Sequence, residues 1–269
     1  IEEFHQAILE NPELAEAYSY LGKIHTDFGS AEEGVLFHNK AVELCPDNPE
    51  FYYRRGSAFR KLGDVDKAIL DYEKTKDLNK EDHHSLFYLG ILYNQKQENE
   101  KALESFYEAI NINPKDAKVH FFLGNLLEDM ENYEEAIKEY TIVIDLEPAD
   151  NNIHSILGKT YHKMGNLEQA FKAYKKSLEI EPNDYMTLTS LGNLYFSNQQ
   201  ASKAIYYFEC ALKLKPNNPT ILNNLAVSHT ILKEYKEAIE VYKKYLQTNP
   251  SDIDKQETLE EMKNLEALL

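Results

Sequence analysis

The sequence predicts an all-α protein built from stacked helical hairpins, and three regularities lead to this fold class. Glycine recurs every 34 residues, at positions 22, 56, 90, 124, 158 and 192. Proline keeps the same interval, at 12, 46, 114, 148, 182, 216 and 250, except that Lys80 replaces the one expected between 46 and 114. Asn or Asp also recurs with this period: Asn48, Asp82, Asp116, Asp150, Asp184, Asn218 and Asp252. Such a period is typical of repeat architectures, in which each unit packs only against its neighbours.

Each 34-residue interval is predicted to hold two helices. The recurring Asn and Asp side chains can accept hydrogen bonds from the free N–H groups at a helix start, which stabilises it by about 1 kcal/mol. A proline suited to the first helical position follows two of them, at Pro49 and Pro219. A second start lies within the intervals, where Ser30, Asn132 and Asn166 precede Glu or Gln by three residues and predict capping boxes.

The recurring glycines fall inside the first predicted helix, where Gly costs roughly 0.5–1 kcal/mol relative to Ala. We therefore expect the two helices of a pair to cross at the glycine, with a small residue of the second helix opposite. That small residue recurs as Gly34, Ala68, Ala102, Ala136, Ala170, Ala204 and Ala238. Four residues later comes a larger ring, which is expected to fill the space around the crossing: His38, Tyr72, Phe106, Tyr140, Tyr174, Phe208 and Tyr242.

This pattern resembles the tetratricopeptide repeat, whose signature includes Leu-Gly-x2-Tyr, Ala-x3-Phe and a closing Pro. The interval with Leu89, Gly90, Tyr93, Phe106 and Pro114 carries it fully. The resemblance implies a right-handed α-solenoid of seven stacked helix-turn-helix repeats, with first helices lining a concave surface. The repeats are 15–48, 49–82, 83–116, 117–150, 151–184, 185–218 and 219–252. Departures are local, such as Arg55 in place of the signature Leu and Lys80 in place of Pro.

Both ends are predicted to be incomplete repeats. Residues 1–14 match the second helix of an incomplete repeat, and their apolar face of Phe4, Ala7 and Ile8 lacks a first helix of its own. That edge indicates either a truncated chain or a surface that docks onto more protein. Residues 253–269 are expected to form a C-terminal capping helix over the last repeat. Its apolar residues at helical spacing are Ile253, Leu259, Met262, Leu265 and Leu268.

Composition excludes several classes of partner. The formal charge of −17 argues against nucleic acid, whose binding needs clustered Lys and Arg, and against anionic membrane surfaces. No run approaches the roughly 18 apolar residues of a membrane span, so we expect no membrane insertion. The two cysteines, Cys45 and Cys210, are far apart, which favours a reducing compartment and a cytoplasmic location.

No catalytic or metal-binding pattern emerges, so we expect no enzyme activity, no cofactor and no metal site. The histidines mostly occupy ring positions of the repeat, which favours a packing role over metal ligation: His25, His38, His120, His154 and His229. His83 and His84 lie at a repeat junction, where a solvated helix start is favoured over a metal or pH-sensing role.

Candidate partner-binding residues follow from the fifth and sixth positions of each repeat, which face the groove in the family. At position five, groove exposure is favoured for Tyr53, Phe87 and Phe121; at position six, exposure and packing on the next repeat have equal support. The assigned set is Tyr20, Tyr53, Arg54, Phe87, Tyr88, Phe121, Phe122 and Asn125.

Arg54, Arg60 and Lys61 add local positive charge to this region. They could meet an acidic partner segment or a terminal carboxylate, but the reading slightly favoured is that they balance Asp64 and Asp66. The clamp by which some family members hold a terminal carboxylate is not expected, because only Asn193 and Asn224 match its central pair.

Three functional hypotheses follow. The leading one is a non-enzymatic scaffold that binds a peptide or helical segment of a partner protein in its concave groove and assists complex assembly. The alternative is a regulatory or substrate-selecting arm of a larger enzyme whose catalytic domain lies outside this segment. A third is self-association through the N-terminal edge.

Overall fold

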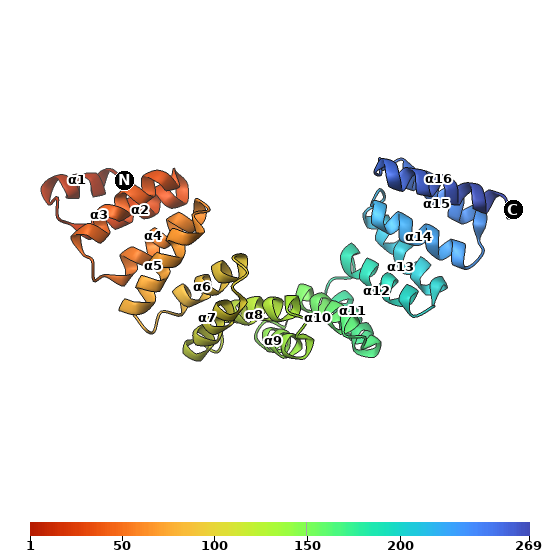
Figure 1. Ribbon diagram of the computed structural model, residues 1–269, viewed down its shortest axis with the longest axis horizontal. Coiled ribbons are helices and arrows are strands. Elements are labelled where there is room, and N and C mark those ends of the chain that lie inside the picture. Colours follow the sequence, from red (N-terminus) through yellow and green to blue (C-terminus); the bar gives the residue numbers. More distant parts are fainter. Residues whose placement is uncertain (149) are drawn as a thin grey trace. The chain divides into compact units, whose positions relative to one another are not determined.

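The computed structural model describes residues 1–148 and 150–269, and within them the chain is entirely helical (Figure 1). The helices are α1 (Glu2–Glu10), α2 (Ala15–Phe28), α3 (Ala31–Leu44), α4 (Pro49–Lys61), α5 (Val65–Leu78), α6 (His83–Gln95), α7 (Asn99–Ile112), α8 (Ala117–Asp129), α9 (Tyr133–Leu146), α10 (Asn151–Lys163), α11 (Leu167–Ile180), α12 (Tyr185–Ser197), α13 (Ala201–Leu214), α14 (Pro219–Ile231), α15 (Tyr235–Leu246) and α16 (Asp252–Glu266). None of these described helices is long and apolar enough to cross a membrane.

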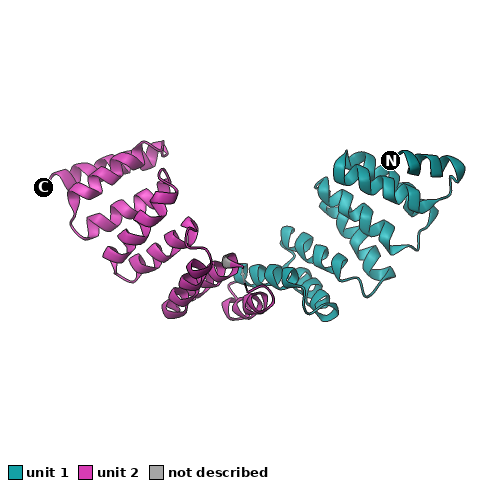
Figure 2. Cartoon of the chain, turned by 180° about the vertical axis from the view of Figure 1, so that it is seen from behind, with its two compact units in different colours: residues 1–130 teal, residues 131–269 magenta. Residues whose placement is uncertain are grey.

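The chain divides into two compact units, residues 1–130 and 131–269 (Figure 2). In the first unit α2 packs on α3, α4 on α5 and α6 on α7, and each pair packs on the helix that follows it. The second unit repeats this arrangement with α10 on α11, α12 on α13 and α14 on α15. The division falls between α8 and α9, within the interval 117–150 that the sequence predicts as one repeat.

The glycines of the first helices lie against the ring of the second helix, which fills the space around the crossing as predicted. A Cβ added to Gly90 would lie 2.5 Å from the Phe106 ring, and one added to Gly192 would lie 2.6 Å from the Phe208 ring. Both rings are fully buried. In the first pair the small residue also lies at the crossing as predicted, since a Cβ added to Gly34 would lie 2.9 Å from the Gly22 carbonyl oxygen.

Most predicted helix starts carry the expected side-chain cap. The side chains that accept a backbone N–H are Asn48, Asp82, Asp116, Asp150, Asp184 and Asn218. Asp252 was a wrong assignment, because Ser251 caps α16 by accepting from the Asp254 N–H. Of the three capping boxes, Ser30 and Asn166 accept as expected, whereas Asn132 makes no side-chain cap hydrogen bond.

A second 34-residue regularity lies in the turns between paired helices. In the turns after α4, α6, α8, α10, α12 and α14, one residue has a left-handed φ near +60° to +80°, at positions 63, 97, 131, 165, 199 and 233. The turn after α2 lacks it, since Gly29 has a φ of −128°. Only Gly63 and Gly165 suit this conformation, and the other four positions hold Gln, Glu, Gln and Lys. The sequence pattern did not reveal this turn, because just two of its six members are glycine.

The terminal helices bury less apolar surface than predicted. In α16, Met262 and Leu265 are buried with Thr258, while Ile253, Leu259 and Leu268 are exposed. The helix packs on α15 through a narrow face, which includes a threonine in place of one expected aliphatic residue. At the other end, α1 packs on α2, and Phe4, Ala7 and Ile8 are half-buried.

Two polar groups occupy ring or leucine positions inside the first unit. Arg55 replaces the signature leucine, and its guanidinium makes two hydrogen bonds, of 2.7 and 2.8 Å, to the carboxylate of buried Asp71. His38 fills the ring position beside Gly22 and is 1% exposed, as its packing role predicts. Neither of its ring nitrogens has a hydrogen-bond partner. Burial lowers the pKa of His38 to about 4, and the nearby Arg54 and Arg55 charges add to this shift.

Candidate functional site

The first helices of the first unit carry a run of aromatic rings that we name the aromatic strip. Its members lie at the fifth and sixth positions of α2, α4, α6 and α8. They are Tyr20, Tyr53, Phe87, Tyr88, Phe121 and Phe122. The 34-residue period repeats these positions at the same point of each first helix.

The rings on α6 and α8 form an interlocked group. Phe87 lies 5.2 Å from Tyr88 and 5.3 Å from Phe122, centroid to centroid, and Phe122 lies 5.5 Å from Phe121. The two contacts of Phe122 are edge-to-face, with interplanar angles of 78° and 88°. Edge-to-face pairs are favourable beyond the area that they bury, so each ring holds its neighbours in place.

The strip is tied to the core through Tyr72 of α5, which is fully buried. Tyr88 stacks on the Tyr72 ring at 5.4 Å, and Tyr53 lies 5.7 Å from Tyr72 and 6.3 Å from Tyr88. The Tyr72 hydroxyl is 2.9 Å from the Ser57 hydroxyl. Burial raises the pKa of the Tyr53 hydroxyl, and the neighbouring Tyr88 and Tyr72 hydroxyls add to the shift, so this hydroxyl stays uncharged near pH 7.

On α2 the strip continues through a cation–π contact. The Arg54 guanidinium lies 4.6 Å from the centre of the Tyr20 ring. The same guanidinium donates to Glu50 at 2.7 Å and to the Ser19 hydroxyl at 3.1 Å. On its other side Tyr20 stacks on Phe4 of α1, at 5.4 Å and 15°. Helix α1 therefore extends the strip, a contribution that the sequence pattern did not indicate because no whole repeat contains Phe4.

Exposure within the strip differs from the expectation for the two positions. The most exposed rings are Tyr20, at 44%, and Phe122, at 36%, and both are sixth-position residues. The fifth-position residues Tyr53, Phe87 and Phe121 are half-buried. Two of them lean on the second helix of their own pair, since Tyr53 contacts Tyr72 and Phe87 contacts Phe106. The remaining assigned residue, Asn125, lies half-buried on α8.

The positive residues near the strip are not balanced by the acids that the sequence suggested. Asp64 pairs with Lys67 at 2.7 Å, and Asp66 pairs with Lys96 at 2.7 Å. Lys61 donates to the carbonyl oxygens of Thr26 and Asp27 at the end of α2. The favoured reading of this charge cluster is therefore wrong, because Asp64 caps and pairs within α5 and Asp66 pairs with a residue of α6.

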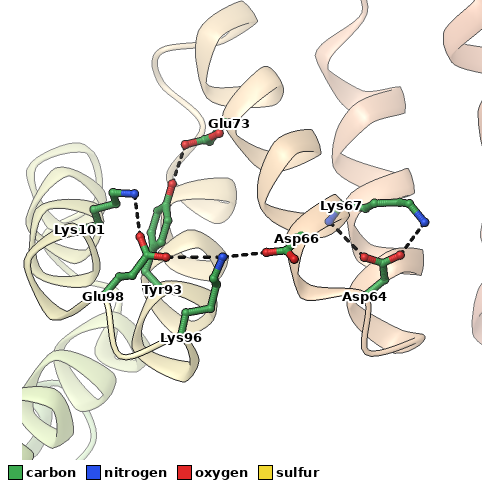
Figure 3. Close-up of polar contacts among 8 residues, drawn as sticks. All are labelled: Asp64, Asp66, Lys67, Glu73, Tyr93, Lys96, Glu98 and Lys101. Atoms are coloured by element: carbon green, nitrogen blue, oxygen red, sulfur yellow. Dashed lines mark hydrogen bonds and ion pairs between the residues drawn. The ribbon is translucent and has the colours of Figure 1, made fainter.

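A polar network on α5, α6 and α7 lies outside the strip (Figure 3). Lys96 bridges Asp66 and Glu98, at 2.7 and 3.5 Å, and Glu98 also pairs with Lys101 at 2.6 Å. Tyr93 donates to Glu73 at 2.5 Å. Lys101, Tyr93 and Glu73 also line a cavity of about 430 Å³. Because the ion pairs are exposed, each contributes little stability, but together they connect successive helix pairs.

The histidine junction is also a set of ordinary contacts. His83 and His84 lie 4.0 Å apart, ring to ring, and the His83 Nε2 atom is 3.7 Å from an Asp116 carboxylate oxygen. Among the described residues, no group of three or more His, Cys, Asp or Glu side chains has the arrangement to hold a metal ion.

Comparison with known proteins identifies the repeat. Three family models of the tetratricopeptide repeat match residues 39–69, 90–131 and 117–150. A fourth, the tetratricopeptide repeat domain of cytochrome c-type biogenesis protein H, matches residues 143–256. The chain belongs to the tetratricopeptide repeat family. No curated protein sequence matches it.

Solved tetratricopeptide repeat structures share the fold. The C-terminal part of a repeat-containing protein from Cytophaga hutchinsonii has a TM-score of 0.78 at 18% identity, covering 90% of this chain and 99% of its own. YrrB, described as a TPR protein with an unusual peptide-binding site, has a TM-score of 0.61 at 24% identity, and the match covers 70% of this chain and 96% of the YrrB chain. MamA has a TM-score of 0.57 at 26% identity, with 60% and 94% covered.

Proposed function

We propose that this chain is a non-enzymatic interaction scaffold that assists assembly of a larger complex. It binds an extended or helical segment of a partner protein along the aromatic strip, in the concave groove that the repeat pattern predicts. The observation that carries this proposal is the exposure of Tyr20, which contacts Phe4 and Arg54, and of Phe122, which belongs to an interlocked group of rings. Large aromatic side chains dominate the binding energy of protein interfaces.

Rigidity of the strip supports the same proposal. Phe122 is held by Phe87 and Phe121, and Tyr20 lies between Phe4 and Arg54. Rings that are fixed before binding lose little conformational entropy on binding, so more of the contact energy goes into affinity. YrrB, with the same fold, is described as having a peptide-binding site, which supports peptide binding as a role for this surface.

The location that we propose is the cytoplasm. Cys45 and Cys210 are both free cysteines, and Cys45 is exposed. Free thiols persist in reducing compartments, which favours this assignment. The proposal involves no catalytic step, cofactor or metal.

The test uses a partner captured from the source cells and then purified, with its affinity for the full chain measured by calorimetry. The variant carries Tyr20→Ala with Phe122→Ala, since truncating half-buried Phe87 and Phe121 would also disturb packing. The matched control carries Leu36→Ala with Leu70→Ala, which removes two exposed apolar side chains from α3 and α5, outside the strip.

We expect the strip variant to bind at least about tenfold more weakly, because each ring is a candidate hot spot. The control should bind as the parent chain does, and all three proteins should have the same helical circular dichroism. Equal affinities for the strip variant and the control would overturn the proposal.

A further inference from the structure

Arg60 stands apart from the other positive residues near the strip. It is exposed on the last turn of α4, and its guanidinium lies 4.6 Å from the centre of the Tyr88 ring. In the described part of the chain, no carboxylate forms an ion pair with it. The acids nearest in sequence, Asp64 and Asp66, pair with Lys67 and Lys96 instead.

The Arg60 guanidinium is positioned before any partner binds. The Tyr88 ring beneath it is itself stacked on buried Tyr72. Burial raises the pKa of the Tyr72 hydroxyl, and the nearby Ser57 hydroxyl and Arg60 guanidinium oppose that shift. A guanidinium held over a ring keeps edge N–H groups for a bidentate contact with a carboxylate.

Arg54 provides the contrast within the same surface. It too lies over a tyrosine ring, but Glu50 neutralises it at 2.7 Å. Lys61 is used by the carbonyl oxygens at the end of α2. Of the three positive residues beside the strip, only Arg60 directs its charge outward without an acidic partner.

The distance from Arg60 to the apolar anchor limits the spacing within a ligand. From the guanidinium the path runs to Tyr88, then to Phe87 and then to Phe122, in steps of 4.6, 5.2 and 5.3 Å. The two ends of this path are thus separated by no more than about 15 Å, which an extended peptide spans with about four residues at roughly 3.4 Å each.

We infer that Arg60 binds a carboxylate of the partner segment, placed within about four residues of an aromatic or aliphatic side chain that contacts Phe122. This inference rests on the proposed function and adds the chemistry of the ligand. The chain's charge of −17 repels acidic segments at long range, so the expected ligand carries a single acid beside its anchor rather than an acidic run.

The experiment is a selection of random twelve-residue peptides displayed on phage against the immobilised full chain. It is run in parallel on the parent chain, on Arg60→Gln and on Lys67→Gln. Lys67 is an exposed lysine on α5 outside the strip, so its substitution changes the net charge equally and serves as the matched control. Selected peptides are then synthesised with an amidated C-terminus and titrated, alongside versions in which a free C-terminal carboxylate replaces the Asp or Glu.

We expect the parent chain and Lys67→Gln to enrich Asp or Glu within four positions of an aromatic or aliphatic residue, and Arg60→Gln to enrich the apolar residue alone. A peptide selected on the parent chain should bind Arg60→Gln about tenfold more weakly, since a charge-assisted hydrogen bond contributes of order that factor. This ratio should shrink as salt rises from about 50 to 500 mM, because salt screens the pair.

Each other outcome has a definite meaning. Apolar enrichment without an acid, or an acid that persists with Arg60→Gln, overturns the inference and leaves the proposed function standing. A free C-terminal carboxylate that replaces the Asp or Glu in titrations supports the site and identifies its source as a chain terminus. Absence of any enriched peptide counts against both proposals, and enrichment lost equally in Lys67→Gln shows a general charge effect and overturns the role of Arg60.

Discussion

Replacing His38 with phenylalanine should stabilise the first unit and remove an acid-sensitive step. His38 is buried beside Gly22 with both ring nitrogens unpartnered. The equivalent position elsewhere holds Phe106 or Phe208, whose rings would lie 2.5 and 2.6 Å from a Cβ added to the facing glycine, close to the 2.7 Å for His38 and Gly22. A phenyl ring therefore fits this site, and it has no polar atom that must leave water.

The expected gain in the free energy of unfolding has two parts, one present at pH 7 and one that appears at lower pH. At pH 7, removing buried polar atoms that lack hydrogen bonds should raise the free energy of unfolding by about 1–3 kcal/mol. Below pH 6.5 a larger difference appears, because the His38 pKa falls from 6.5 to about 4 in the folded chain. The unfolded chain then binds the extra proton, so stability is lost as pH falls from 6.5 towards 4. A shift of this size corresponds to roughly 3 kcal/mol in total.

The assay must report on the first unit, because neighbouring repeats unfold with partial independence. Amide hydrogen exchange of α2 and α3, followed by mass spectrometry at pH 7, 6 and 5, gives the local free energy of opening. We expect the advantage of His38→Phe to grow as pH falls. The control is His84→Gln, which replaces an exposed histidine of α6, outside the α2 and α3 pair whose opening is measured. A His38→Phe variant with the stability and pH dependence of the parent chain would refute this reasoning.

Three other substitutions test the packing. Gly90→Ala should lower the free energy of unfolding by about 1–3 kcal/mol, despite the better helix propensity of alanine, because its Cβ would meet the buried Phe106 ring. Urea unfolding that shows the same free energy as the parent chain would contradict this. Lys233→Gly should stabilise the turn between α14 and α15 by about 0.5 kcal/mol, because glycine adopts the left-handed φ there without strain. Lys243→Gly, inside α15, should destabilise that helix by about as much, and amide exchange rates in α14 and α15 measure both effects. Arg55→Leu should lower the free energy of unfolding by about 3 kcal/mol, because it leaves the Asp71 carboxylate buried and unpaired. Adding Asp71→Ala should recover most of this stability in thermal unfolding. A double variant that recovers none would show that the unpaired carboxylate is not the cause of the loss.

The sequence predicted the helical repeat well, because a feature that is replaced in one repeat can still be recognised from the other repeats. Caps such as Asn48 and Asn218 act through the adjacent backbone, so a linear pattern suffices to find them. The turn conformation at Gln97 and Lys233 was missed, since residues other than glycine adopt it there.

For the site, the sequence located the strip but not the exposure of its members. Phe87 is less exposed than Phe122 because it packs against the Phe106 ring of the second helix. The pattern of a single helix does not show this contact between helices. The role of Asp64 was misjudged for a similar reason. A position just before a helix favours capping and local pairing over the more distant Arg60, and the Asp64–Lys67 pair lies within one turn.

The central claim, that the aromatic strip contacts a partner segment, is tested most directly by fluorine NMR. A 4-fluorophenylalanine is placed at Phe122 alone in one sample and at Phe171 on α11 alone in another, and a peptide from the captured partner is titrated into each. We predict that the Phe122 resonance shifts and saturates at the calorimetric Kd while the Phe171 resonance stays in place. A bound peptide that leaves the Phe122 resonance unmoved would contradict the account.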